Sequence, residues 1–457
     1  MDSSALNALS PVDGRYRAGT QALAKLLSEA ALIRERTRVE ALWLGHLTAK
    51  VPTLLLAPLP AAVTDCIAAL AADPGDDAAA QVKTIEARIN HDVKAVEYFV
   101  RERLAAVGAT PAVLELVHFG CTSEDINNLS YARLLLRARE EVLLPQLDLL
   151  LAELHAAARG HAALPMLSRT HGQAATPTTL GKEFANIAAR FTRARARLAA
   201  VTILGKWNGA VGNLNAQVVA VPGADWLAIS ESFVTLCGVT CNPYTTQIEP
   251  HDWVGEYCDA VAAINVIGID MCRDIWGYVS LGYLRQRAVA GEVGSSTMPH
   301  KINPIDFENA EGNLGLANAL LRHFAEKLPV SRWQRDLTDS TVLRNVGVAL
   351  GHTLLAWRAA LRGMSRIDAD PARIAQDLDN AWEVLGEAVQ TVLRAAGVPN
   401  GYEKLKDFTR GQPMDRALLA GFIATLPLPA AERERLTRLT PAGYLGVAAT
   451  LAQRGSQ

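Results

Sequence analysis

Amphipathic segments with helical spacing dominate the chain. Their apolar residues recur three and four positions apart, which places them on one face of a helix. The clearest face comprises Leu147, Leu150, Leu151, Leu154 and Ala158. A second face comprises Phe184, Ile187, Ala188, Phe191 and Leu198. Residues 251–287 and 304–328 have the same character, whereas strand-like alternation is brief, for instance at residues 218–221. The pattern predicts an all-α fold.

Turn signals divide this helical chain into three predicted domains. Gly108 and Pro111 break the first helical section, and a turn at Asp368 follows the long-helix section. Asp370 is the predicted N-cap of the next helix and Pro371 its first residue. We predict an N-terminal helical domain at residues 1–111, a central long-helix bundle at 112–364 and a C-terminal helical domain at 365–457.

Composition and charge are those of an ordinary globular protein, with half of the residues hydrophobic and a fifth charged. The formal net charge of −2 gives no overall basic field for a nucleic acid, although a small phosphorylated substrate needs only a few cations. No run reaches the roughly 18 apolar residues of a membrane span, and the first residues do not resemble a signal peptide. We therefore expect a cytoplasmic protein without a nucleic-acid or membrane partner.

The six cysteines are scattered along the chain, which favours reduced thiols over a disulfide framework. Cys237 and Cys241 are four positions apart, but no second Cys or His pair follows at the spacing of a zinc finger. A metal site is therefore not expected.

A polar segment at residues 291–304 interrupts two helical patterns and contains two glycines and two serines. Asn303, Pro304 and Asp306 form a helix start, so residues 291–302 are predicted to be a mobile loop between helices. Such a loop can bring backbone N–H groups, hydroxyls and Lys301 to an oxyanion and close over it. An interhelical loop without chemistry is the alternative.

A second polar segment, Ser-Arg-Thr-His-Gly-Gln at residues 168–173, precedes a break at Pro177. A histidine between small polar residues can be held by hydrogen bonds and titrate near neutrality, as a general acid must. A structural role for His171 is the alternative. Arginines on the polar face of the following helix are interpreted as a solvated or subunit-facing surface. These are Arg190, Arg193, Arg195 and Arg197.

Four further polar clusters occur at residues 10–16, 90–94, 122–128 and 332–344. The last contains arginines, whose guanidinium groups suit phosphate or carboxylate. Turns and caps alone would explain the other three. For residues 122–128, Ser123 as a helix N-cap is the simple explanation.

Together these segments resemble the fumarase and aspartase superfamily. Its signature loop, Gly-Ser-Ser-x-Met-Pro-x-Lys-x-Asn-Pro, is matched at every fixed position by residues 294–304. Several families share that loop, so the other segments decide among them. They are similar to the adenylosuccinate lyases in their longer bacterial form at residues 10–16, 90–98, 122–128, 168–177, 242–252 and 331–345.

The resemblance implies a three-domain all-α subunit whose long central helices pack with those of other chains into a homotetramer with shared active sites. The leucine face around Leu150 fits such an assembly, since long helices need partners. The implied substrates are adenylosuccinate and its aminoimidazole counterpart SAICAR, which would release fumarate and leave AMP and AICAR. No metal or organic cofactor is implied, because the elimination is redox-neutral.

The same resemblance implies the catalytic roles. Ser295 matches the general base, and His171 matches the general acid that protonates the departing nitrogen. Lys301, Ser296 and Asn303 would hold the succinyl carboxylates.

Further substrate-binding positions of the family are matched by Arg15, Tyr16, Asn90, His91, Asp92, Thr122, Ser123, Gln247, Ile302, Asn309, Arg335, Ser340, Thr341, Val342, Leu343 and Arg344. Among these we assign the phosphate to His91, with Arg15, Arg335 and Arg344 nearby.

Two other functions compete with this interpretation. A sister lyase acting on argininosuccinate or malate would bind no nucleotide phosphate. A non-catalytic helical scaffold would retain only the fold, but the presence of Ser295, His171 and Lys301 argues against it.

Overall fold

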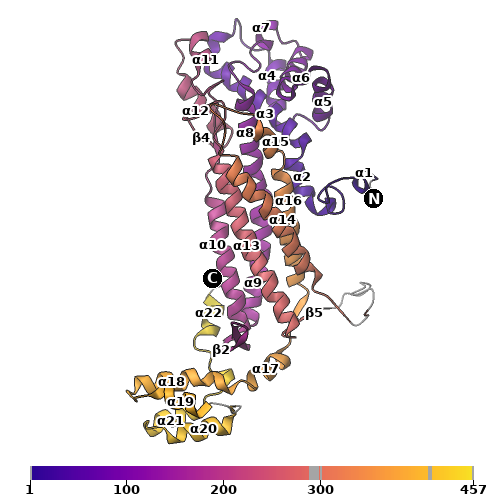
Figure 1. Ribbon diagram of the computed structural model, residues 1–457. Coiled ribbons are helices and arrows are strands. Elements are labelled where there is room, and N and C mark those ends of the chain that lie inside the picture. Colours follow the sequence, from indigo (N-terminus) through magenta and orange to yellow (C-terminus); the bar gives the residue numbers. More distant parts are fainter. Residues whose placement is uncertain (1–2, 288–297, 299–300, 410–413, 455–457) are drawn as a thin grey trace. The chain divides into compact units, whose positions relative to one another are not determined.

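The fold is mostly helical, as the amphipathic pattern predicts. The computed structural model describes residues 3–287, 298, 301–409 and 414–454, and Figure 1 draws its ribbon. Within that part of the chain, the strands are short and form three two-stranded sheets. The predicted all-α fold class is therefore confirmed.

Two compact units interleave along the chain. The first comprises Met1–Leu147, Ala194–Val266 and Gly312–Ala356, and the second comprises Asp148–Arg193, Ile267–Glu311 and Trp357–Gln457. The predicted domain boundaries at residues 111 and 364 remain a prediction.

Helices form almost all of the first unit. Its elements are α1 (Ser3–Leu6), α2 (Arg17–Leu27), α3 (Glu29–Lys50), η1 (Pro52–Leu54), α4 (Ala61–Ala72), α5 (Ala78–Ile89), α6 (Asp92–Ala106), α7 (Pro111–Leu114), α8 (Ser123–Arg137), η2 (Ala138–Leu143), β3 (Leu204–Gly205), α11 (Asn215–Ala220), α12 (Trp226–Leu236), β4 (Thr240–Cys241) and α15 (Thr338–Leu343). Strands β3 and β4 pair in parallel, and the π-helical turn η2 continues α8.

Helix α3 is buried on most of its surface. Ser28 caps its amino terminus by accepting a hydrogen bond from the Ala31 N–H at 3.2 Å, and Glu29 complements the helix dipole in the first turn. Among its apolar residues, Trp43 lies 3.7 Å from Trp207 between ring centroids. The helix also buries the charged residues Glu35, Arg36 and Glu40. Because buried charges are costly unless they are paired, these residues indicate polar networks inside the unit.

The second unit contains a β-hairpin and the C-terminal helices. Its elements are β1 (Pro165–Thr170), β2 (Gln173–Thr179), β5 (Leu284–Gln286), β6 (Ile367–Ala369), α17 (Pro371–Asp379), η3 (Trp382–Leu385), α18 (Gly386–Ala395), α19 (Gly401–Thr409), α20 (Arg416–Thr425), α21 (Ala430–Thr437), η4 (Pro441–Gly443) and α22 (Ala448–Arg454). Strand β1 pairs with β2, and β5 with β6, both antiparallel. Asp370 caps α17 by accepting from the Arg373 N–H at 3.0 Å, and Pro371 is the first helical residue, as predicted.

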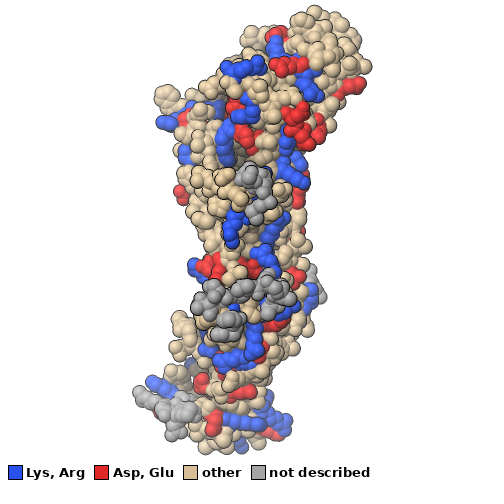
Figure 2. Space-filling view, turned by 90° about the vertical axis from the view of Figure 1, so that its right-hand side faces the viewer, with Lys and Arg blue, Asp and Glu red and all other residues tan. Residues whose placement is uncertain are grey.

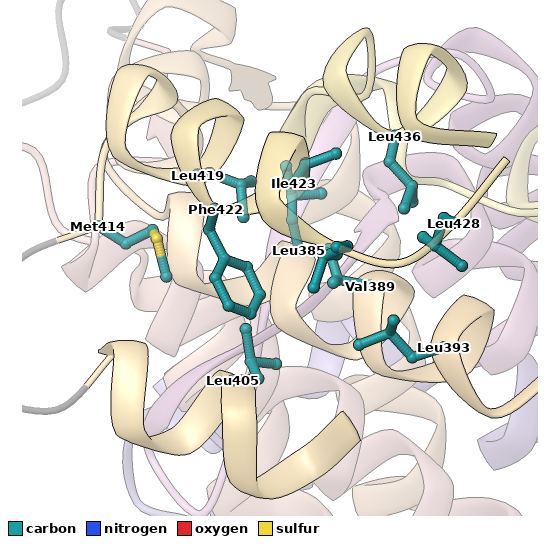
Figure 3. Close-up of a cluster of buried hydrophobic side chains, with 11 residues drawn as sticks. Leu385, Val389, Leu393, Leu405, Met414, Leu419, Phe422, Ile423, Leu428 and Leu436 are labelled. Atoms are coloured by element: carbon teal, nitrogen blue, oxygen red, sulfur yellow. The ribbon is translucent and has the colours of Figure 1, made fainter. Parts of the chain in front are cut away.

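The C-terminal helices enclose an apolar cluster of their own, which Figure 3 shows. Phe422 and Ile423 project from α20 toward Leu385, Val389 and side chains of the neighbouring helices. Each fully buried side chain of this size contributes roughly 1.5–3 kcal/mol relative to exposure, so the cluster holds these short helices together.

Several long helices have residues in both units. They are α9 (Leu144–Gly160), α10 (Leu180–Ala200), α13 (Asp252–Ser280), α14 (Ile305–Lys327) and α16 (Val346–Met364). The two predicted apolar faces lie on α9 and α10, and all of their residues are buried. Within the first unit, Asn265 on α13 donates to Thr353 on α16 at 3.0 Å. Within the second, Arg362 on α16 pairs with Asp306 on α14 at 2.7 Å.

Two predictions about short segments are wrong. Residues 218–221 lie at the end of helix α11 and its C-cap rather than in a strand, because the buried Gln217 side chain anchors this turn by donating to the Gly120 carbonyl at 2.6 Å. Ser123 is not the N-cap of α8. Thr122 is the N-cap, and Ser123 is the first helical residue.

The predicted loop at residues 291–302 lies outside the described residues except for Met298, Lys301 and Ile302. The helix that follows, α14, begins at Ile305, one residue after the predicted start at Pro304. Helix ends commonly shift by one or two residues, and the Pro304 carbonyl still accepts from the first turn.

Charged side chains of both signs are interspersed over the face that Figure 2 draws, in keeping with a net charge of −2. In the part of the chain that the structure describes, no helix is long and apolar enough to cross a membrane.

Candidate active site

His171 occupies the tip of the hairpin in the second unit. Thr170 pairs with Gln173, so His171 and Gly172 form a two-residue turn with φ of 54° and 76°. Positive φ at both central residues is the geometry of a type I′ turn, which matches the twist of the flanking strands. Glycine adopts it without strain, and histidine tolerates it better than most residues. The turn exposes the His171 side chain at the end of a rigid support.

Strand β1 of this hairpin is tied to α17. Arg169 donates to Asp377 at 3.1 Å, and the Tyr283 hydroxyl donates to the same carboxylate oxygen at 3.0 Å. Leu167 packs with Leu378 and its neighbours in a small buried cluster. These contacts fix the strand that leads to His171.

The signature loop is only partly described. Ser295 and Ser296 lie outside the described residues. Lys301 and Ile302 are exposed, and the Lys301 N–H donates to the Met298 carbonyl at 2.9 Å. Asn303 and, on α14, Asn309 are half-buried. The structure therefore describes four of these candidate residues in the second unit in addition to His171.

In the first unit, Thr122 and Ser123 form the amino terminus of α8. Thr122 and Asp125 make a capping box, in which the Thr122 N–H donates to Asp125 at 2.8 Å. Asp125 is fully buried and also pairs with the fully buried Lys206 at 3.0 Å. This anchoring holds a helix N-terminus, which favours an anion, at a half-buried position.

Arg335 is held by two side chains from distant segments. It donates to Gln247 at 3.2 Å and to Glu124 at 3.0 Å. Asp339 lies 3.7 Å away, accepts from the Ser340 N–H at 2.8 Å and faces His251 at 3.4 Å. Burial alone would raise the pKa of Asp339, but His251, Arg335 and the Ser340 N–H together lower it.

His91 and Asp92 lie at the amino terminus of α6. The His91 ring caps this helix, because its Nδ1 accepts from the Lys94 N–H at 3.1 Å. Acceptance at Nδ1 places the ring proton of the neutral form on Nε2, which can then donate to a ligand. The residue before it, Asn90, ends α5 in the left-handed conformation with φ of 53°.

Asp92 joins two arginines. Its Oδ2 pairs with Arg36 at 3.0 Å and with Arg344 at 3.0 Å, and Arg344 also pairs with Glu29 at 2.8 Å. Burial would raise the pKa of Asp92, but Arg36, the Val93 N–H and Arg344 lower it below its ordinary value. The carboxylate therefore stays charged and fixes both guanidinium groups.

Asn127 connects these two groups of residues. Its amide oxygen accepts from Arg36 at 2.8 Å, and its amide nitrogen donates to Glu124 at 2.8 Å. The resemblance did not name Arg36, Glu124 or Asn127. Glu124 and Asn127 lie in a polar cluster that the sequence does single out, whereas Arg36 lies on a helix rich in charge and gives no such signal.

The remaining candidates lie in the N-terminal segment and in α15. Arg15 and Tyr16 line a cavity of about 1030 Å³ formed by the N-terminal segment, and the Arg15 guanidinium lies 5.7 Å from the Tyr16 ring centroid. In α15, Thr341 is exposed and Val342 is half-buried, whereas Leu343 is 4% exposed and is a packing residue.

Backbone strain gathers at these segments. Asn90, His171, His251 and Trp333 have positive φ although none is glycine. Such residues persist where the surroundings fix them, often at functional sites. Among the described residues, no group of three or more His, Cys, Asp and Glu side chains could hold a metal ion.

Comparison with known proteins identifies the family. Residues 15–318 match the family described as Lyase, and residues 331–445 match the family described as Adenylosuccinate lyase C-terminal. Adenylosuccinate lyase of Escherichia coli (strain K12) is 52% identical over 454 residues, which cover 99% of this chain and 99% of that protein. The chain belongs to the adenylosuccinate lyase family. A family member from Vibrio cholerae serotype O1 is 50% identical over 455 residues, with 99% and 100% coverage.

Family membership confirms the predicted resemblance and makes the chain a lyase. Solved structures show the same fold at lower identity. The 3-carboxy-cis,cis-muconate lactonizing enzyme from Pseudomonas putida has a TM-score of 0.75 at 23% identity and covers 96% of this chain and 98% of its own. A fumarate lyase from Mesorhizobium sp. BNC1 has a TM-score of 0.75 at 18% identity, with 95% and 97% coverage.

Proposed function

We propose that the protein releases fumarate from adenylosuccinate, giving AMP, and from SAICAR, giving AICAR, by β-elimination. The observation that carries this proposal is the 52% identity to an adenylosuccinate lyase over 99% of both chains. The contacts of the first unit support it further. They group arginines, a histidine and a helix N-terminus, which suit an anionic nucleotide.

The proposed elimination needs a base, an acid and a pocket for negative charge. Ser295 removes a proton from the succinyl carbon next to a carboxylate, and that carboxylate takes up the charge. Cleavage of the C–N bond then forms the double bond of fumarate, while His171 gives a proton to the departing nitrogen. Ser295 acts as an alkoxide when water is excluded, and Lys301, Ser296 and Asn303 hold the carboxylates. The exposed turn that fixes His171 supports its role.

The phosphate of the nucleotide is assigned to the first unit. His91 offers an Nε2 donor because its Nδ1 is engaged in capping α6. Arg344 and Arg335 supply guanidinium groups, which donate to Asp92 and Glu124 in the structure. Thr122 and Ser123 add the N-terminus of α8, and Arg15 completes the set.

We further propose a cytoplasmic homotetramer whose active sites combine residues of different subunits. Exposed apolar residues on long helices support an assembly, for example Leu149 at 56%, Val266 at 48% and Leu316 at 58% exposure. All six cysteines are free thiols, which suits a reducing compartment. The reaction needs no cofactor, because it transfers no electrons between substrate and protein.

The test is to incubate the purified protein with adenylosuccinate and with SAICAR and to quantify fumarate, AMP and AICAR. We expect both substrates to be cleaved, and the rate to be unchanged by EDTA. Argininosuccinate and malate serve as matched controls and should not react. Turnover of either control, or none of adenylosuccinate, would refute the proposal.

A further inference from the structure

We propose that Glu124 is a positioning residue for substrate binding, which orients the Arg335 guanidinium before the substrate arrives. This inference rests on the proposed function. It adds to the substrate-binding set a residue that is not expected to touch the substrate itself.

Glu124 pairs with Arg335 and is the more deeply buried of the two. One carboxylate oxygen, Oε1, accepts both from Arg335 Nη2 at 3.0 Å and from Asn127 Nδ2 at 2.8 Å. The Glu124 side chain is 4% exposed, whereas that of Arg335 is 15% exposed. The carboxylate is therefore enclosed by protein, whereas part of the Arg335 side chain stays exposed.

Asn127 donates to the same Glu124 oxygen that accepts from Arg335. Its amide oxygen accepts from Arg36 Nε and its amide nitrogen donates to Glu124. Because arginine can only donate and a carboxylate can only accept, the Asn127 amide fits in one orientation. Arg36, whose side chain is 2% exposed, then reaches Asp92. A continuous network of hydrogen bonds and ion pairs thus links Asp92 to Arg335, which are both candidate substrate-binding residues.

This arrangement has a physical reason. A free arginine side chain loses considerable rotamer freedom when a ligand immobilises it, and a side chain that is already held loses less. Arg335 donates to Gln247 through Nη1 and to Glu124 through Nη2. Of these two partners, Glu124 is the one that carries a negative charge. Removing Glu124 should therefore loosen Arg335 and weaken substrate binding more than it slows the chemical step.

The experiment measures KM and kcat for adenylosuccinate in two variants. Glu124→Ala removes charge and acceptor, and KM should rise about tenfold or more with kcat changing less than about threefold. Glu124→Gln keeps an amide oxygen as acceptor but loses the charge, so KM should rise by about threefold, between wild type and the alanine variant.

A double variant tests whether the effect passes through Arg335. In an Arg335→Ala background, Glu124→Gln should raise KM no further, because the group that it positions is gone. An additional rise equal to that of the single variant would overturn the proposal. If Glu124→Ala does not fold, Glu124→Gln carries the test, and a KM within about twofold of wild type overturns it.

Glu35 provides the matched control. It is a carboxylate of the same unit with 1% side-chain exposure, and it bridges Arg133, at 2.5 Å, and Arg38. It has no described hydrogen bond or ion pair to a candidate site residue. Glu35→Gln should lower the thermal midpoint and leave KM unchanged. If its KM rose as much as that of Glu124→Gln, the rise would reflect a general loss of stability, and the proposal would be overturned. A wild-type protein inactive on adenylosuccinate would refute the proposed function instead.

Discussion

Arg344 donates a hydrogen bond to Asp92 at 3.0 Å, although 252 positions separate them in the chain. Two residues that family resemblance names separately therefore belong to one ion-pair network, in which Arg344 Nη1 also reaches Glu29. The two carboxylates use different nitrogens of one planar group. The network therefore fixes the orientation of the Arg344 guanidinium in addition to pairing its charge.

Arg344→Lys tests this geometry. A single ammonium group cannot reproduce two nitrogens that point at two carboxylates, so KM for adenylosuccinate should rise about tenfold with a smaller change in kcat. The control is Arg435→Lys, since Arg435 pairs only with the exposed Glu432 of its own helix in the described contacts. Steady-state kinetics give KM and kcat for both variants. A wild-type KM for Arg344→Lys would show that substrate binding does not need an arginine that contacts two carboxylates.

The His171 turn allows a test that separates backbone from chemistry. Asparagine is favoured at positive φ, so His171→Asn should keep the turn at φ of 54°, whereas His171→Ala adds strain. Both variants lack the proposed acid and should lose turnover by a factor on the order of 10²–10⁴ while still binding substrate. The measurements are kcat, inhibitor affinity and thermal midpoint. Should His171→Asn retain turnover within about tenfold of wild type, His171 is not the general acid.

A close backbone approach supports the junction of α9 and α10. A Cβ added at Gly181 would lie 2.6 Å from the Ala162 nitrogen and closer still to the Ala158 carbonyl, while the Gly181 N–H donates to His161 at 3.0 Å. Gly181→Ala should therefore destabilise the protein by about 1–3 kcal/mol or more. Gly160→Ala is the control, because its Cβ would meet nothing within 4 Å. Urea unfolding at one protein concentration measures the stability of both variants. Equal unfolding midpoints for Gly181→Ala and Gly160→Ala would contradict the predicted clash.

The local features were the ones that the sequence could predict. The apolar face on α9 and the Asp370 cap depend on spacing within a few residues, and both are as expected. The brief alternation at 218–221 gave a wrong strand prediction because the segment is anchored by a distant contact. Gln217 donates to the Gly120 carbonyl, which lies 97 positions earlier in the chain. Arg36 could not be foreseen for the same reason. The side chain that it pairs with, Asp92, lies on another helix.

The buried pair of His118 and Glu40 predicts a pH dependence of stability. Their Nδ1 and Oε1 atoms lie 2.6 Å apart, and Glu40 is fully buried. Burial alone would lower the pKa of His118, but the charge and hydrogen bond of Glu40 raise it above the ordinary 6.5. The folded pKa thus exceeds the unfolded one. The stabilisation is fully present below about pH 6.5 and is lost as pH rises through the folded pKa.

Glu40→Gln should remove this contribution. The variant should be less stable than wild type in mild acid, and the two free energies of unfolding should converge as pH rises. Urea unfolding from pH 5.5 to 9 at fixed protein concentration measures the difference. A constant gap across that range would show that His118 does not titrate with the pair.

The last prediction concerns assembly. If His171 and Ser295 reach each active site from different subunits, two inactive variants should rescue each other. His171→Ala and Ser295→Ala are mixed in equal amounts under conditions that exchange subunits. Each restored site needs one chain with an intact histidine and another with an intact serine, each drawn with a probability of one half, so about a quarter of the sites in a symmetric tetramer should recover. Exchange is verified by mass spectrometry with one variant isotopically labelled. Activity that stays at the level of the separate variants after complete exchange would mean that both groups come from the same chain.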